Sequence, residues 1–184
     1  MSNVKTILLV GVGGQGTILV SKILTHGLLK AGFDVKMSEV HGMAQRGGSV
    51  STQVRFGDKV WSPIIGEGGA DILISFEKME AVRWANFLKP DAKVIIADTA
   101  IPSLPIATGA EQYPEGTIEA MQKLFDVTVV DADKIAREKG NPRGANVALL
   151  AEAIKVCNFD FVDWKEVLTE VLPAKILDAS LKLL

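Results

Sequence analysis

The sequence predicts a three-layer α/β/α domain with a mostly parallel sheet and an inserted β-hairpin. Short, continuous apolar runs alternate with helical patterns along the chain, and such runs are typical of parallel strands that are buried on both faces. One alternating segment, near residue 50, has the pattern of a hairpin with one solvated face. The length of 184 residues suits one domain, 1–184, with a core of its own.

The first strand and the turn that follows it organise the chain. Residues 7–10 form a continuous apolar run, and residues 15–30 then carry apolar side chains at helical spacing. The turn between them has the order G-x-G-x-x-G, which is typical of Rossmann-like sheets and places helix N–H groups beside an anion. The predicted binding residues of this turn are Gly11, Gly13, Gly14, Gln15 and Gly16. We expect a phosphate or a nucleotide-like ligand here; the alternative is a tight turn without a ligand.

A second strand is expected over residues 34–39, after a helix stop at Ala31-Gly32. It ends in Glu39, near the position where dinucleotide-binding folds place the acid that bonds a ribose. Glu39 is therefore a candidate ribose contact. A solvated or ion-paired carboxylate at a strand end is the alternative.

The segment 40–49 breaks the periodicity and holds three glycines. Arg46 can contact a carboxylate or a phosphate through two parallel hydrogen bonds, and His41 can titrate near neutral pH. Gly47 and Gly48 let the backbone turn sharply or approach a ligand closely. These residues predict a functional loop with Arg46 and His41 as catalytic candidates, whereas the alternative is a structured loop whose arginine pairs with an acid.

The alternating segment 50–56 is followed by Gly57-Asp58 and then by residues 59–61. This order predicts a hairpin between 50–56 and 59–61, placed after the second strand. A standard dinucleotide-binding fold would continue with a helix at this point.

The remaining strands and helices follow from apolar runs, helical spacing and capping residues. Asp98-Thr99 follows one of these strands at the carboxyl end, where open α/β sheets place ligands. Strands are expected at 70–75, 93–97 and 127–130. Helices are expected at 77–88, 117–124 and 132–139, the last with Asp131 as its cap, and an irregular loop is expected at 101–116. Further helices are expected from Asn141-Pro142, from Asp163 with Glu166 in a capping box, and after Pro173.

Composition and charge exclude several classes of protein. The net charge of −2 predicts no broad nucleic-acid surface, and no apolar run reaches the roughly 20 residues that cross a membrane. The start of the chain leads directly into the first strand, so we expect no signal peptide and a cytoplasmic location. Cys157 is the single cysteine and suits core packing, and His26 and His41 are the two histidines. No iron–sulfur cluster or metal site is expected on this chain.

No catalytic motif accompanies the glycine-rich turn. The sequence lacks a G-x-S-x-G elbow, and Thr17-Ile18 follows the turn where a P-loop would have lysine. A binding site without its own reactive groups is typical of a subunit that serves a catalyst on another chain.

Three stretches carry a resemblance to a known family. GVGGQG at residues 11–16 and EVHGMAQRGGSVSTQVRFG at 39–57 resemble the gamma-type domain of the 2-oxoacid:ferredoxin oxidoreductases, as does GNPRGANVALL at 140–150. The form HGMAQRGGSV is most similar to the small, or beta, subunits of the indolepyruvate branch. The resemblance covers essentially the whole chain, although the wider family tends to show a shorter G-x-x-x-RGG signature.

The resemblance implies one half of a two-subunit oxidoreductase. The assembled enzyme would decarboxylate a 2-oxoacid oxidatively, form the acyl-CoA and CO2, and pass electrons to ferredoxin. Thiamine diphosphate and the 4Fe-4S clusters would lie on the large, or alpha, subunit. Two further roles are hypotheses from the chemistry of the residues and are not fixed by the resemblance: the exposed N–H groups of the turn at 11–16 receive a phosphate of coenzyme A, and Arg46 binds a substrate carboxylate or a phosphate. The alternatives are an independent NAD(P)-dependent dehydrogenase, from the glycine motif with Glu39, and a purely structural subunit.

Overall fold

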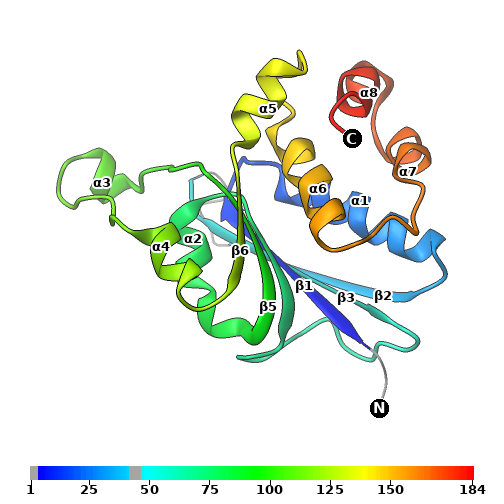
Figure 1. Cartoon of the computed structure of the whole chain (residues 1–184), viewed down its shortest axis with the longest axis horizontal. Coiled ribbons are helices and arrows are strands. Elements are labelled where there is room, and N and C mark those ends of the chain that lie inside the picture. Colours follow the sequence, from blue (N-terminus) through cyan, green and yellow to red (C-terminus); the bar gives the residue numbers. More distant parts are fainter. Residues whose placement is uncertain (1–3, 42–46) are drawn as a thin grey trace.

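The computed structural model describes residues 4–41 and 47–184, and two groups of elements build one α/β domain (Figure 1). The strands are β1 (Lys5–Val12), β2 (Asp34–His41), β3 (Ser49–Gly57), β4 (Ala70–Ser75), β5 (Leu88–Ala97) and β6 (Asp126–Val130). The longer helices are α1 (Thr17–Lys30), α6 (Ala145–Val156), α7 (Trp164–Val171) and α8 (Ala174–Leu181). The shorter ones are α2 (Lys78–Arg83), η1 (Ala85–Phe87), α3 (Leu104–Ala107), α4 (Thr117–Gln122) and α5 (Ala132–Glu138).

The described strands form one sheet in the order β2-β3-β1-β4-β5-β6. Strands β1, β4, β5 and β6 pair in parallel, whereas β3 lies antiparallel between β1 and β2. Five of these strands therefore point the same way, and their carboxyl ends share one edge of the sheet. The predicted mostly parallel sheet is confirmed.

Alternate residues of the central strand enter two separate cores, which makes the domain three-layered. Ile7 and Leu9 of β1 pack toward α1 and α6, and Leu8 and Val10 pack with the other core, which includes Met121 of α4. All four β1 side chains are fully buried. Figure 1 shows α1 and α6 on one side of the sheet and α2 and α4 on the other.

The inserted antiparallel strand is present, but its predicted partner is wrong. Ser49–Gly57 forms β3, whereas residues 59–61 form no strand. Both edges of β3 already pair, with β1 on one side and β2 on the other, so no edge remains for residues 59–61. The hairpin is therefore β2–β3. The N–H of Val60 instead donates to the Asp34 carboxylate at 2.9 Å.

Several predicted helix boundaries move. The helix expected to reach residue 88 ends at Arg83, and a 3₁₀ turn then leads into β5 at Leu88. The helix expected to start at Asn141 starts at Ala145, because Asn141 and Gly144 close a turn before it (Gly144 N to Asn141 O, 2.8 Å). The region predicted as an irregular loop also contains the short helix α3.

Two predicted caps and the terminal helix are confirmed. The Asp131 carboxylate accepts from Lys134 N at 2.9 Å, and Asp163 accepts from Glu166 N at 3.0 Å. Leu177 and Leu181 pack against the core that contains α1 and α6. The C-terminal helix α8 therefore docks on this domain.

Candidate functional site

The glycine-rich turn connects β1 to α1, and the structure explains why Gly11, Gly14 and Gly16 are glycines. Gly14 and Gly16 have φ values of +108° and +84°, which residues other than glycine rarely adopt. A Cβ on Gly16 would lie 2.3 Å from Nδ2 of Asn146, and a Cβ on Gly11 would lie 2.9 Å from Oε1 of Gln15. Around Gly14 the space is open to 4 Å. Gly11 and Gly16 thus serve close packing, and Gly14 faces open space.

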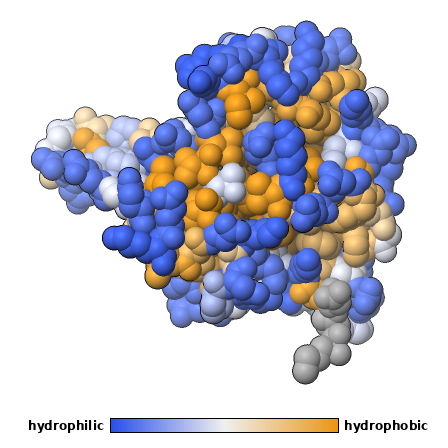
Figure 2. All heavy atoms as spheres, in the orientation of Figure 1, coloured by the Kyte–Doolittle hydropathy of each residue, from blue (hydrophilic) through white to orange (hydrophobic). Residues whose placement is uncertain are grey.

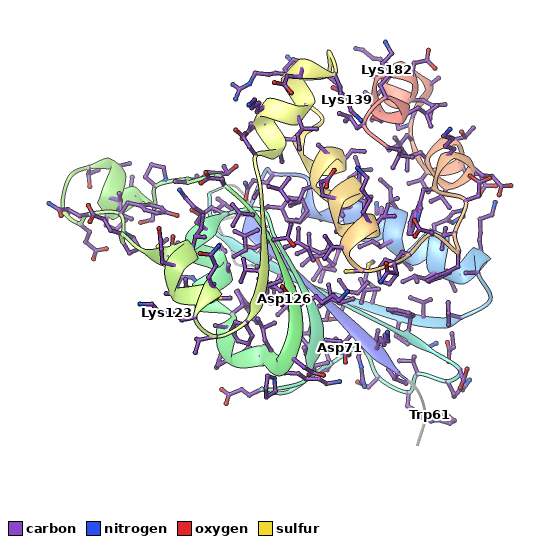
Figure 3. The ribbon with its side chains drawn as sticks, in the orientation of Figure 1. Trp61, Asp71, Lys123, Asp126, Lys139 and Lys182 are labelled. Atoms are coloured by element: carbon purple, nitrogen blue, oxygen red, sulfur yellow. The ribbon has the colours of Figure 1, made fainter. Side chains whose placement is uncertain are left out.

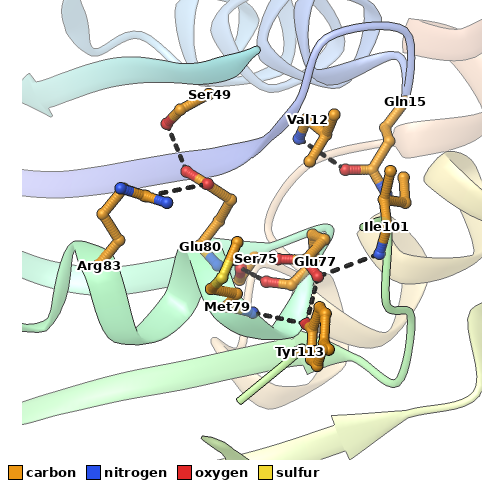
Figure 4. Close-up of polar contacts among 10 residues, drawn as sticks. All are labelled: Val12, Gln15, Ser49, Ser75, Glu77, Met79, Glu80, Arg83, Ile101 and Tyr113. Carbon is orange, nitrogen blue, oxygen red and sulfur yellow. Dashed lines mark hydrogen bonds and ion pairs between the residues drawn. The ribbon is translucent and has the colours of Figure 1, made fainter. Parts of the chain in front are cut away.

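Gln15 bridges the ends of two neighbouring parallel strands. Its Oε1 accepts from Val12 N at 2.8 Å, and its Nε2 donates to Phe76 O at 2.6 Å (Figure 4 shows the first of these). The helices that follow β1 and β4 pack on opposite faces of the sheet, so this is the crevice where open α/β sheets bind ligands. A protein amide spans that crevice here.

The second glycine pair lies beside the first turn. Gly13 N donates to Gly48 O at 2.8 Å, and Gly47 N donates to Gly13 O at 3.1 Å. The structure therefore brings together the two glycine motifs that the sequence separates. His41 ends β2, but its side chain and the whole of Arg46 lie outside the described residues.

Glu39 lies beside the turn but not where a dinucleotide-binding fold would place it. It lines a hollow of about 360 Å³ together with Gly13, Gly14 and Gly16, and Ser21 Oγ donates to its Oε1 at 3.3 Å. Strand β3 intervenes between β2 and β1, so two strand spacings of about 4.8 Å separate Glu39 from the strand that carries the turn. Its role as a ribose contact stays a prediction.

A cavity of about 370 Å³ opens where α1 and α6 begin. Its polar walls come from the turn, from the carboxyl end of β5, from the first turns of α5 and α6, and from the loop that precedes α6. The polar residues in its lining are Gln15, Thr99, Asp133, Arg143 and Asn146. The sequence predicted Gln15, but the loop before α6 was expected only as a helix cap.

The electrostatics of this cavity favour an anion. Neither α1 nor α6 has an acidic residue in its first turn or a side-chain cap at its N-cap. Within the described residues, the N–H groups of Gly16, the N-cap of α1, and of Ala145, the first residue of α6, have no hydrogen-bond acceptor, and both residues line this cavity. The N–H groups of Thr17 and Ile18 also have no acceptor there, but these residues line the hollow beside Glu39. Two helix N-termini thus present partial positive charge, and the exposed Arg143 adds a full charge at the rim. Asp133, which accepts from Thr99 Oγ1 at 3.1 Å, is the acid of the lining.

A buried carboxylate network lies next to this cavity and was missed from the sequence (Figure 4). Glu77 is fully buried and accepts from Glu80 N at 2.9 Å, from Ile101 N at 3.2 Å and from the Tyr113 hydroxyl. Glu80, also buried, contacts Ser49 and Arg83. The sequence signal was weak: Glu77 follows the carboxyl end of β4 by two residues, where ligand-binding and structural side chains both occur.

Other groups in the described residues have structural roles. Burial raises the pKa of Cys157 to about 11, so this thiol stays protonated and packs beside the core. Within the ranges 4–41 and 47–184, no group of three His, Cys, Asp or Glu side chains is arranged to hold a metal ion. None of the helices that the structure describes is both long and apolar enough to cross a membrane.

Comparison with known proteins decides the family. The model of the pyruvate ferredoxin/flavodoxin oxidoreductase family matches residues 6–184. The chain belongs to this family. Indolepyruvate oxidoreductase subunit IorB of Archaeoglobus fulgidus is 39% identical over 184 residues, which cover 97% of this chain and 90% of the relative. The IorB subunit of Thermococcus kodakarensis is 36% identical, with coverage of 96% and 90%.

Solved structures of oxidoreductases have the same fold. The gamma subunit of a keto/oxoacid ferredoxin oxidoreductase from Geobacter sulfurreducens superposes with a TM-score of 0.72 at 17% identity, covering 99% of this chain and 93% of that one. The 2-oxoglutarate:ferredoxin oxidoreductase of Magnetococcus marinus superposes with a TM-score of 0.72 at 18% identity. It was solved with 2-oxoglutarate, coenzyme A and succinyl-CoA bound, and this chain covers 30% of its length.

Proposed function

We propose that this chain is the small subunit of an indolepyruvate ferredoxin oxidoreductase and that the cavity between α1 and α6 receives a phosphate group of coenzyme A. The assembled enzyme decarboxylates the 2-oxoacid oxidatively to the acyl-CoA and CO2 and passes the electrons to ferredoxin. The relatives named IorB, which match nearly the whole chain, support the subunit identity. The observation that carries the coenzyme A contact is the convergence of two uncapped helix N-termini on one cavity.

The chemistry of the cavity suits a phosphate. The N–H groups at the starts of α1 and α6 can donate to phosphate oxygens, and the helix dipoles stabilise the negative charge. Arg143 at the rim can bind two oxygens of the same group in parallel. Gly14, with open space around it, lets a ligand approach the backbone.

The redox and carbanion chemistry belongs, in this proposal, to a large subunit with thiamine diphosphate and 4Fe-4S clusters. The IorB relatives are named as subunits, which supports the existence of a partner chain. The Magnetococcus marinus chain supports it too, because this fold covers 30% of a longer polypeptide there. We place the complex in the cytoplasm, with ferredoxin as the electron acceptor, and we expect the small subunit alone to be inactive. Purified alone, it should neither turn over indolepyruvate nor reduce an acceptor.

The test of the coenzyme A contact is Arg143→Gln in the reconstituted complex. We expect the KM for coenzyme A to rise about tenfold, because a charge-assisted pair is worth roughly 1.5–3 kcal/mol, while the KM for indolepyruvate stays within twofold. Arg137→Gln is the matched control: Arg137 is also exposed, on the neighbouring α5, but does not line the cavity. Equal KM values for coenzyme A in the two variants would remove the cavity from the proposal.

Arg46 remains a candidate for a contact to the substrate carboxylate or a phosphate, and His41 remains a catalytic candidate that titrates near neutral pH. Arg46→Ala should raise the KM for indolepyruvate or for coenzyme A, and the affected substrate identifies the group that Arg46 binds. His41→Ala should alter the pH profile of kcat if its imidazole titrates in the reaction. Unchanged constants and an unchanged profile would leave both residues as structural parts of their loop.

The rival dehydrogenase reading has a direct test of its own. In the structure β3 separates β2, which carries Glu39, from β1, and Gln15 spans the crevice, which disfavours a dinucleotide. Titration of the chain with NADH should therefore leave nicotinamide fluorescence unchanged. Saturable enhancement at micromolar NADH would favour the dehydrogenase.

A further inference from the structure

An arm of residues 99–116 projects from the body of the domain. It leaves the carboxyl end of β5, carries α3, and returns to α4; Figures 1 and 2 show it extending away from the rest of the molecule. No residue of α3 is buried, and Leu104 is 77% exposed. Ile106 is half-buried, but Leu104 gains little burial within the described part of this chain, so its ordering is not offset here by apolar contacts.

The base of the arm, in contrast, is fastened on both sides. Lys78 N donates to Thr99 O at 3.0 Å, and Ile101 N donates to the buried Glu77 at 3.2 Å. On the returning side, the Tyr113 hydroxyl donates to Glu77 and accepts from Met79 N at 3.1 Å (Figure 4). Burial, and then the Glu77 carboxylate, raise the pKa of Tyr113 far above its usual value, so the phenol stays protonated and keeps donating. The arm therefore has a fixed direction and an uncovered apolar tip.

The charge of the arm restricts what can cover it. Residues 99–116 contain Glu111 and Glu115 and no lysine or arginine. A complementary surface would combine an apolar groove for Leu104 and its neighbours with a basic rim. A second copy of this arm would bring like charges together.

The position of the arm connects it to the candidate site. Thr99 and Ile101, at its base, also line the cavity between α1 and α6. A partner that holds the arm would therefore lie beside the opening of that cavity. The fold covers 30% of the Magnetococcus marinus chain, so there it belongs to a longer polypeptide, which agrees with a large neighbour in this family.

We propose that residues 99–116 are a docking arm that inserts into an apolar, basic-rimmed groove of the large subunit and sets that subunit over the cavity. The identity of the occupant rests on the proposed function. Glu77 and Tyr113 are positioning residues in this arrangement, because they hold the arm at its base and touch no substrate.

The test compares two exposed leucines in the complex of small and large subunits. Leu104→Asp should weaken association of the subunits at least tenfold, because it places a charge in an apolar groove and adds to an acidic arm. Leu124→Asp is the matched control: Leu124 is 65% exposed but lies just before β6, at the opposite edge of the sheet from the arm. Both variants should unfold at the wild-type temperature when alone, since neither leucine is buried.

A milder variant tests the fastening. Tyr113→Phe removes the hydroxyl that joins the returning side of the arm to Glu77, and we expect association to weaken about threefold, because the docking conformation becomes a smaller part of the population. If Tyr113→Phe binds the large subunit with the affinity of the wild type, Tyr113 has no positioning role.

Three results of this comparison overturn the docking arm, and only the third also refutes the proposed function. Equal affinity of Leu104→Asp and wild type for the large subunit shows that the arm does not dock there. A wild-type small subunit that forms dimers, which Leu104→Asp dissolves, assigns the arm to a second copy. A wild-type chain that binds no large subunit refutes the proposed function and the occupant together, whereas the first two results leave the proposed function intact.

Discussion

Polar groups differ between the two ends of the parallel strands, called here the amino edge, where the strands start, and the carboxyl edge, where they end. At the amino edge, side chains of this domain satisfy them: Asp71 accepts from Thr6 N at 2.8 Å and pairs with Lys89 at 2.5 Å, and Asp34 pairs with Lys36 at 2.6 Å. Figure 3 places Asp71 and Trp61 at this end of the molecule, away from Lys139 and Lys182. At the carboxyl ends of the strands, Glu77 satisfies the start of α2, but the N–H groups of Gly16 and Ala145, where α1 and α6 begin, open onto a cavity instead.

The difference follows from the direction of the strands. Parallel strands all end at one edge, so the helices that follow them begin there and leave their first N–H groups without helical partners. At the amino edge the strands start, and acidic and lysine side chains can form hydrogen bonds and ion pairs with the polar groups there. Function is therefore expected at the carboxyl ends of the strands, where some N–H groups have no acceptor among residues 4–41 and 47–184.

The largest effect is expected from Glu77, the buried acid of the carboxyl edge. Glu77→Ala leaves three donors without their acceptor in a buried site and should lower the free energy of unfolding by about 3 kcal/mol. Urea unfolding of the small subunit measures this loss. A loss under about 1 kcal/mol would mean that this part of the carboxyl edge is held by packing alone.

The glycine-rich turn should follow with a smaller loss. Gly16→Ala has to adopt φ near +84° and to displace Asn146, so we expect a loss of about 2 kcal/mol. Gly14→Ala has a similar backbone but nothing within 4 Å, and should lose about 1 kcal/mol. The difference between the two variants in urea unfolding isolates the contact between α1 and α6. Equal losses would show that Asn146 moves aside freely.

At the amino edge, Asp71→Ala tests whether losing a hydrogen-bond acceptor lowers the free energy of unfolding as much as Glu77→Ala does. The N–H of Thr6, which is 2% exposed, loses its acceptor, while the ion pair with Lys89 is partly solvated. We expect a loss of about 1 kcal/mol, less than for Glu77, with Asp71→Asn recovering most of it. Thermal and urea unfolding of both variants check this order, and its reversal would break the comparison of the edges.

The smallest effect concerns pH at the same edge. The Lys36 ammonium, and then the N–H of Val60, lower the pKa of Asp34 from 3.8 to about 2. A lowered folded-state pKa adds stability above the unfolded pKa, and this contribution disappears as the pH falls through the folded value. The stability difference between wild type and Asp34→Asn should therefore be constant above about pH 5 and shrink between about pH 4 and 2. A difference that grows on acidification would contradict the assignment of this pair.

Much of the architecture was predictable because it depends on local patterns. The apolar run of β1, the helical spacing after it and the caps at Asp131 and Asp163 all act within a few residues along the chain. The hairpin partner was not predictable in this way, because residues 59–61 lie nearer to β3 in sequence than β2 does, although β2 is the strand that pairs with it. The choice depends on which strand fills the second edge of β3 in the folded sheet.

In the candidate site, too, some features depend on local sequence and others on contacts between distant residues. The sequence alone determined the glycine-rich turn, the helix that starts at it and the family, because these rest on residue types at short, fixed spacing. Only the tertiary structure decided that Gly47 and Gly48 lie against Gly13, that Arg143 shares a cavity with Gln15, and that Glu77 fastens the arm. The physical reason is that these contacts join residues far apart in the chain, and the packing of the sheet and its helices sets their distances.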